Sequence, residues 1–149
     1  MAEVRPVVTG LKLSRIASLN VNMLRACGLF RLNKARKLLE EYIGEETTFD
    51  ELKIPFRCVA TDLISGKTVC FSKGNVIDAI IASSSVPGAF SPVERDGMLL
   101  VDGGVIERVP VREVKEMGAE VIVAVDVLGN LVKSVSDRPS NLIETFLRY

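Results

Sequence analysis

The sequence predicts an α/β fold, and three observations support that prediction. Apolar residues recur at helical spacing in 33–44, 75–86 and 110–118, and each stretch is bounded by a capping residue, a glycine or a proline. Apolar residues at strand spacing lie between and after these stretches, at 55–62, 67–72 and 121–126. Helices that alternate with strands in this way are typical of a sheet covered by helices.

The chain is predicted to hold one domain with three regions. Residues 1–53 are mostly helical and basic, 54–128 form an α/β core, and 129–149 form a linker and a helix. This last helix begins after Ser140, and the end of the sequence cuts it short. We therefore expect only part of a domain, with further βα units absent.

The helices of the first region follow from their end signals. One helical stretch covers about 11–27. A second helix is predicted to begin with Asn33 as its N-cap and to end at Gly44. A Thr-x-x-Glu capping box at 48–51 predicts one short helical turn. The side chains of the second helix that we expect to face inward are Leu38, Leu39, Tyr42 and Ile43.

The core begins with a predicted hairpin and a capped helix. A two-residue turn at Ser65-Gly66 would place Cys70 opposite Thr61 on the neighbouring strand. The next helix is predicted to use Asn75 as its N-cap and to stop before Pro87, because the residue before a proline avoids the helical region.

The last predicted elements form a crossover. A helix with Val111, Val114 and Met117 on its inner stripe is closed by Gly118. It leads to a strand at 121–126 that is apolar on both faces, which predicts burial inside a parallel or mixed sheet.

A second hairpin presents the principal candidate for catalysis. Asp96-Gly97 lies between two strand-like runs and favours a type I′ turn. The second of these runs ends at Asp102, and Gly103 and Gly104 follow. Glycines permit positive φ and close approach of another backbone or a substrate, so the carboxylate is expected to lie at a strand end beside open space.

The composition restricts the chemistry. The chain has 149 residues and no histidine, which excludes Ser-His-Asp and Cys-His catalysis and any His-ligated metal. A catalytic base must therefore be a carboxylate. Three cysteines, Cys27, Cys58 and Cys70, form no C-x-x-C pair, and we expect buried free thiols.

Several motifs in this order resemble the patatin-like phospholipases. They are IPFRCVATDLISGK at 54–67, ASSSVPGAF at 82–90, the Asp102-Gly103-Gly104 box, and GAEVIVAVDV at 118–127. The resemblance implies part of a three-layer α/β/α sandwich with a mixed, largely parallel sheet. It also implies a Ser-Asp dyad that hydrolyses acyl esters of lipids, with Asp102 as the dyad aspartate and no cofactor.

The resemblance also assigns neighbours to Asp102. Gly103, Gly104, Ser85, Val86, Pro87 and Phe90 would form the substrate pocket or the wall of the active site. The Ser85 hydroxyl is expected to bond back to its own helix rather than to attack the substrate.

One part of the family pattern is absent. None of the serines lies in G-x-S-x-G, the motif that carries the nucleophile, and no glycine-rich oxyanion loop is present. We therefore expect the chain to be inactive alone and to form homo-oligomers or to need a missing segment in trans. A non-catalytic module that binds acyl chains or a protein is the second hypothesis.

A third hypothesis uses three aspartates. Asp62, Asp102 and Asp126 each follow apolar strand residues, and if they met at one sheet edge they could bind Mg²⁺ for phosphoryl transfer. The resemblance favours structural, turn-capping roles for Asp62 and Asp126.

The charge distribution bears on partners. The net charge is zero, which argues against nucleic acid, yet residues 1–37 carry eight Lys/Arg and one Glu. This basic region, with Leu13, Ile16, Ala17, Leu24 and Cys27 on one helical stripe, either contacts an anionic membrane or packs on the acidic remainder. We expect a cytoplasmic protein, peripheral to the inner membrane face if the first alternative holds.

Overall fold

The computed structural model describes residues 17–19 and 28–126. The strands are β1 (Ser18–Leu19), β2 (Gly28–Arg31), β3 (Cys58–Asp62), β4 (Lys67–Phe71), β5 (Gly88–Phe90), β6 (Val93–Arg95) and β7 (Met98–Asp102). The helices are α3 (Asn33–Ile43), α4 (Val76–Ser83) and α5 (Val111–Glu116), with 3₁₀ turns η1 (Phe49–Glu51) and η2 (Gly103–Val105). None of the helices formed by the described residues has the length and hydrophobicity that a membrane crossing requires.

The strands form two sheets. A four-stranded antiparallel sheet has the order β4-β3-β7-β6, and a three-stranded sheet has the order β1-β2-β5. In the smaller sheet β2 and β5 are parallel, whereas β1 and β2 are antiparallel. This mixture of helices with parallel and antiparallel strands confirms the predicted α/β class.

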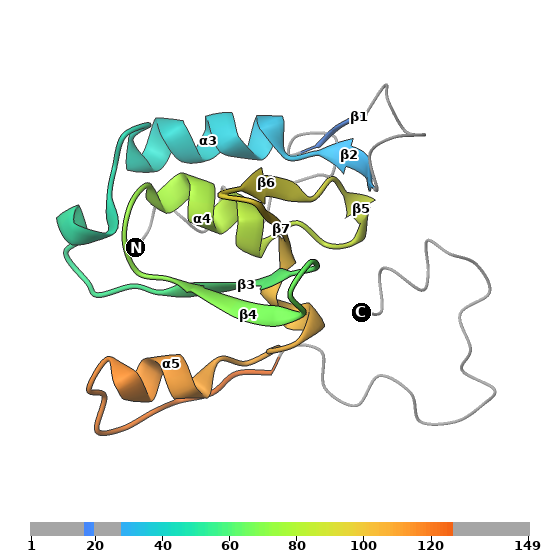
Figure 1. The fold of residues 1–149 in the computed structure, drawn as a ribbon. Coiled ribbons are helices and arrows are strands. Elements are labelled where there is room, and N and C mark those ends of the chain that lie inside the picture. Colours follow the sequence, from blue (N-terminus) through green and yellow to red (C-terminus); the bar gives the residue numbers. More distant parts are fainter. Residues whose placement is uncertain (1–16, 20–27, 127–149) are drawn as a thin grey trace.

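Helix α4 holds the described part together. Figure 1 shows α3 lying over α4, α4 over β3 and β4, and α5 on the far side of these strands. One face of α4 buries Val76, Ala79 and Ala82 against Ala60 and Leu100 of the sheet. Its other face meets α3, and the contacts on that side involve Ile77, Ile81, Leu32 and Leu39. Helix, sheet and helix thus follow one another as layers.

Several local predictions are confirmed. Asp96 and Gly97 have φ of 50° and 76°, the two positive values that a type I′ turn requires. The Asn75 side chain accepts a hydrogen bond from the Asp78 amide at 3.0 Å, so Asn75 is the N-cap of α4. Gly44 follows α3 with a φ of 97°.

The capping box is also confirmed. The Thr48 amide donates to Glu51 Oε2 at 2.7 Å, and η1 begins directly after Thr48. Because this bond satisfies an otherwise unpaired amide, it fixes the short turn that leads into the sheet.

The prediction of a strand at 121–126 is wrong for this structure. The described residues of that segment form no strand, and Val121, Val123 and Val125 are 84%, 84% and 71% exposed. A strand needs a hydrogen-bonded neighbour, and none of the described strands pairs with this segment.

The hairpin register also differs from the prediction. Cys70 lies opposite Val59, not opposite Thr61. The connection between β3 and β4 is a four-residue loop, 63–66, closed by a 2.8 Å bond from the Gly66 amide to the Asp62 carbonyl. These two additional loop residues shift the pairing by two positions.

Two predictions in the first region need correction. Ser18 and Leu19, inside the stretch predicted as helical, form strand β1, which pairs with β2. Asn33 is the first residue of α3 rather than its N-cap, and no side chain caps that helix. Of the predicted helical stripe the structure describes only Ala17, which is buried. The other stripe residues and residues 129–149 lie outside the described part of the chain.

The inward face of α3 is narrower than predicted. Tyr42 is exposed, whereas Leu38, Leu39 and Ile43 are half-buried. The helix contacts the core mainly through Leu39 and Ala35, because α3 meets α4 along one stripe only.

Candidate active site at Asp102

Asp102 is held at the end of a buried strand. It is the last residue of β7 and lies opposite Ala60 of β3. The two residues before it, Leu100 and Val101, are fully buried, so the strand that carries the carboxylate is fixed on both faces. Asp102 itself is half-buried and opens the turn η2.

Two hydrogen bonds orient Asp102. Its Oδ1 accepts from the Gly104 amide at 2.7 Å, and its own amide donates to the Ser85 carbonyl at 2.9 Å. Among the described residues, no arginine or lysine pairs with the carboxylate and nothing else bonds to it. Within residues 17–19 and 28–126, Oδ2 therefore has no hydrogen-bond partner.

Gly103 is required for close backbone approach, not for positive φ. A Cβ at this position would lie 2.4 Å from the Val59 carbonyl oxygen. A Cβ on Gly104 would lie 2.9 Å from Asp102 Oδ1. The prediction of close approach is therefore confirmed at Gly103, whereas positive φ is not observed, since neither glycine adopts it.

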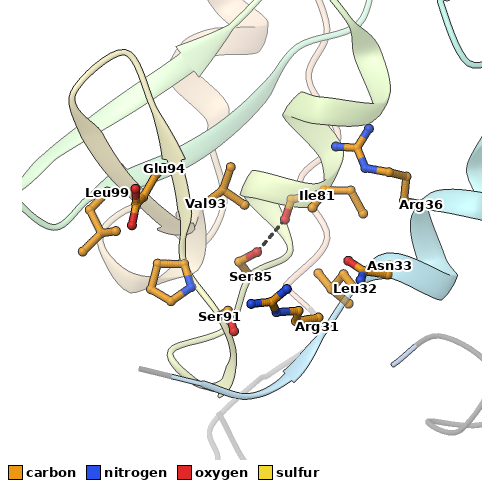
Figure 2. A pocket seen from close by; sticks show the side chains of 11 residues that line it. Arg31, Leu32, Asn33, Arg36, Ile81, Ser85, Ser91, Val93, Glu94 and Leu99 are labelled. Carbon is orange, nitrogen blue, oxygen red and sulfur yellow. Dashed lines mark hydrogen bonds between the residues drawn. The ribbon is translucent and has the colours of Figure 1, made fainter. Parts of the chain in front are cut away.

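Ser85 links the end of α4 to the backbone of Asp102. The residue is 1% exposed, and its Oγ donates to the Ile81 carbonyl at 2.7 Å (Figure 2). The expected bond back to the helix is therefore present. Ser85 contributes its backbone carbonyl, rather than its hydroxyl, to Asp102.

The other predicted wall residues do not all meet at Asp102. Val86 and Pro87 are half-buried and directly follow Ser85. Phe90 lies in β5 and packs against the core cluster of Leu32, Ile77 and Ile81, with its ring 6.5 Å from that of Phe30. Phe90 thus supports the helix layer, and nothing here brings it to the carboxylate.

A separate pocket of about 390 Å³ lies between the start of α3 and the end of α4. Figure 2 shows the Arg31 and Ser85 side chains turned toward it. Of the predicted site residues only Ser85 lines it, and Asp102 does not. Its lining comprises Arg31, Leu32, Asn33, Arg36, Ile81, Ser85, Ser91, Pro92, Val93, Glu94 and Leu99.

One charged side chain of this pocket already has a partner, since Arg36 forms a 2.6 Å ion pair with Asp78. Arg31 and Glu94 both line the pocket as well, so its lining carries charges of both signs. Sequence reasoning missed this pocket because residues near 31 and near 91 meet only through the parallel pair of β2 and β5. The similar tripeptides Gly28–Phe30 and Gly88–Phe90, paired in register, were the available signal.

Asp62 has a structural role. Its carboxylate accepts from the amides of Ile64, Ser65 and Leu99 at 3.0–3.1 Å. The hydrogen bond from the Ser65 side chain, followed by that from the Leu99 amide, lowers the pKa of Asp62 to about 2. The expected turn-capping function is thus observed, and the carboxylate has little capacity left for a metal.

The three aspartates do not meet. Asp62 lies opposite Leu100 and Asp102 opposite Ala60, so the two aspartates are not directly opposed across β3 and β7. Asp126 forms a 2.6 Å ion pair with Arg108. No group of three or more potential ligand side chains gathers within the described part of the chain, so the Mg²⁺ hypothesis loses its geometric basis.

The two described cysteines are poor nucleophiles. Cys58 and Cys70 are free and half-buried. Burial, with a smaller effect of Cys70, raises the pKa of Cys58 to about 12, and burial, with Glu113 next, raises the pKa of Cys70 to about 11. Both thiols stay protonated at neutral pH.

Comparisons with known proteins agree with the motifs around Asp102. A family model described as patatin-like phospholipase matches residues 10–115. Uncharacterized NTE family proteins of Mycobacterium bovis and Mycobacterium tuberculosis are each 34% identical over 122 residues, or 82% of this chain and 34% of each relative. The chain therefore spans about a third of the length of these relatives.

Two longer relatives match a shorter stretch. Patatin-like phospholipase domain-containing protein 7 of Mus musculus is 31% identical over 87 residues, or 57% of this chain and 6% of that protein. Lysophospholipase NTE1 of Saccharomyces cerevisiae is 33% identical over 82 residues, or 55% of this chain and 5% of that protein.

Proposed function

The chain belongs to the patatin-like phospholipase family, and we propose that it supplies the aspartate of a Ser-Asp dyad that hydrolyses acyl esters of lipids. One observation carries this proposal. Asp102 ends a buried strand with Oδ1 oriented by the Gly104 amide, while Oδ2 has no partner among the described residues. A fixed carboxylate with one available oxygen is suited to accept a proton.

In the proposed reaction, Asp102 accepts the proton of a serine hydroxyl as the serine oxygen attacks the ester carbonyl. The proton then passes to the departing alcohol, and water releases the acyl group by the same steps in reverse. Carboxylates are weak bases at neutral pH, so the proton transfer must be concerted with attack. Fixed geometry at Asp102 favours such a concerted step.

The serine must come from polypeptide outside these 149 residues. No serine in the sequence lies in G-x-S-x-G, so we propose that the chain alone is inactive. The relatives are about three times as long as the matched stretch, which supports a requirement for further polypeptide. That further polypeptide would also supply the oxyanion donors.

The substrate would be a phospholipid or another acyl lipid. The relatives named phospholipase and lysophospholipase support this substrate class. Gly103 and Gly104 would flank the reacting centre, and Ser85, Val86 and Pro87 would form the wall beside Asp102, with Phe90 supporting that wall from β5.

A non-catalytic role is the second candidate. The missing nucleophile and the pocket of about 390 Å³, whose lining includes Leu32, Ile81 and Val93, favour a module that binds an acyl chain. Binding of a fluorescent fatty acid by the chain alone, competed by unlabelled fatty acid, would support this role. If the fluorescent fatty acid does not bind, the acyl-binding role is excluded.

The dyad is tested by reconstitution. The chain is co-expressed with a family polypeptide that carries the G-x-S-x-G segment, the complex is isolated by size exclusion, and p-nitrophenyl ester hydrolysis is measured. We expect hydrolysis by the complex, and Asp102→Asn should lower it by roughly 10²-fold or more, since this is the usual cost of losing a general base.

The matched control is Asp96→Asn. Asp96 is an exposed carboxylate in the β6–β7 turn, where asparagine is equally suited to positive φ, so this variant should keep full activity. A complex that assembles but does not hydrolyse the ester, or an Asp102→Asn variant as active as Asp96→Asn, would refute the dyad.

A further inference from the structure

Helix α4 ends in a turn that its own backbone does not complete. The Ser85 amide donates to the Ala82 carbonyl at 3.3 Å, not to the Ile81 carbonyl four residues back. The Ser84 amide reaches the Ile81 carbonyl at 3.3 Å, but it lies closer to that of Ile80, at 3.0 Å. The shortest bond to the Ile81 carbonyl comes from the Ser85 hydroxyl, at 2.7 Å (Figure 2). A side chain thus supplies the hydrogen bond that the backbone of a longer helix would provide.

The same residue holds the end of β7. Strand β6 pairs with β7 from Met98 to Leu100 and does not extend to Asp102. The Asp102 amide instead donates to the Ser85 carbonyl at 2.9 Å. Within the described part of the chain, no other backbone hydrogen bond joins residues 76–87 to β7. Ser85 therefore connects the helix to the strand, because its hydroxyl binds α4 and its carbonyl binds β7.

Burial makes the hydroxyl important for this connection. Ser85 is 1% exposed, so water does not readily replace its bond to Ile81 when the hydroxyl is removed. A buried carbonyl without a partner is costly, and the turn at the end of α4 can relieve that cost by shifting. Such a shift carries the Ser85 carbonyl away from the Asp102 amide.

We propose that Ser85 is a positioning residue for Asp102 and that it acts through its hydroxyl. The bond to Ile81 fixes the Ser85 carbonyl, and this carbonyl fixes the backbone from which the carboxylate extends. The inference rests on the proposed dyad, in which the rate depends on where the carboxylate is held. It differs from a role in the wall of the substrate pocket, which would act on substrate binding.

The first test measures ester hydrolysis by the reconstituted complex. We expect Ser85→Ala to lower kcat by about 10- to 100-fold with KM close to that of the wild type, because small displacements of a reacting group have costs of this order. Ser85→Thr keeps Oγ, and its additional methyl group adjoins the pocket that Ser85 lines, so it should restore most of kcat.

The matched control is Ser84→Ala. Ser84 lies in the same turn and carries the same hydroxyl, but it is exposed and its side chain has no hydrogen bond among the described residues. This variant should keep the wild-type kcat. Ser85→Cys replaces Ser85→Ala if the latter does not assemble, and its kcat should lie below that of the wild type because a thiol is a weak donor.

Three kinetic results would overturn the proposal. Equal kcat in Ser84→Ala and in the Ser85→Ala or Ser85→Cys variant would show that the hydroxyl does not matter. A raised KM at unchanged kcat would assign Ser85 to the wall of the substrate pocket. Equal losses in Ser85→Ala and Ser85→Thr would show that packing, rather than the hydroxyl, is responsible.

The second test requires no activity. The Gly104 amide donates to Asp102 Oδ1 at 2.7 Å, and so short a bond to a carboxylate displaces the amide proton signal downfield in an NMR spectrum. In the chain alone, Ser85→Ala should move this signal upfield and Ser84→Ala should not. A loss of stability alone leaves the signal of the folded chain in place. An unchanged Gly104 signal in Ser85→Ala would overturn the proposal.

The two tests separate this inference from the dyad itself. A wild-type complex that assembles without hydrolysing the ester would refute the dyad. The Gly104 signal would still decide whether Ser85 holds Asp102 in place.

Discussion

Gly103 is the residue at which the fold tolerates least change. A Cβ there would lie 2.4 Å from the Val59 carbonyl oxygen and 2.8 Å from the carbonyl carbon, both of them backbone atoms of a central strand. We expect Gly103→Ala to lower the free energy of unfolding by about 1–3 kcal/mol, because neither backbone can yield without cost. Urea unfolding followed by circular dichroism measures this change.

Gly104 provides the comparison. A Cβ there meets only the Asp102 carboxylate, at 2.9 Å, and a side chain can rotate away. Gly104→Ala should therefore cost less stability than Gly103→Ala while it displaces the carboxylate. Equal losses of stability in the two variants would contradict the close approach at Gly103.

Asp62 gives the chain a defined response to acid. Hydrogen bonds from the Ser65 side chain and the Leu99 amide lower the pKa of Asp62 to about 2, below the value of about 3.9 in an unfolded chain. The charged form thus stabilises the fold above about pH 4, and this contribution is lost as the pH falls toward about 2. Asp62→Asn should weaken the dependence of the urea midpoint on pH in this window.

Two other carboxyl groups contribute to the acid sensitivity of both the wild type and the Asp62→Asn variant. The Thr48 amide lowers the pKa of Glu51, and the Cys70 thiol lowers that of Glu113, so some acid sensitivity remains in the variant. Wild type and Asp62→Asn with parallel curves between pH 2 and 4 would show that the Asp62 bonds are not formed in solution.

At the scale of elements, the two helix starts behave differently. Asn75 caps α4 through the Asp78 amide at 3.0 Å and also donates to the Glu45 carbonyl at 2.7 Å. Asn75→Ala should lower the free energy of unfolding by about 1–2 kcal/mol. Asn33→Ala should change it by less than about 0.5 kcal/mol, because no side chain caps α3. Denaturant titrations measure the free energy of unfolding of each variant. Similar losses in Asn75→Ala and Asn33→Ala would contradict the assigned caps.

Elements with local signals were predictable from the sequence, and those that depend on distant partners were not. The type I′ turn at Asp96-Gly97, the Asn75 cap and the box at 48–51 depend on a few adjacent residues, and all are present. The strand at 121–126 was predicted from its own run of apolar residues, but a strand exists only with a neighbour.

The candidate site likewise has features that the sequence predicted and features that it did not. Asp102 at the end of a strand followed from the hairpin pattern. The pocket near Arg31 and the contact of Gly103 with Val59 did not, because both join segments more than forty residues apart in the chain. Such contacts leave no periodic signal in a single sequence.

At the scale of the molecule, charge separates the two ends of the chain. Residues 1–37 carry eight Lys/Arg and one Glu in a protein of zero net charge. We expect the chain to sediment with vesicles that contain anionic lipid and to be released by high salt, since salt screens such attraction. Neutral vesicles are the control. Equal binding to both vesicle types, or none, would favour the alternative that the basic region packs on the acidic remainder.

The bond between the Asp102 amide and the Ser85 carbonyl has a practical consequence. This proton can exchange with deuterium only when the end of α4 separates from β7. Its exchange rate therefore reports directly on how often the carboxylate leaves its place, without any need for substrate or turnover.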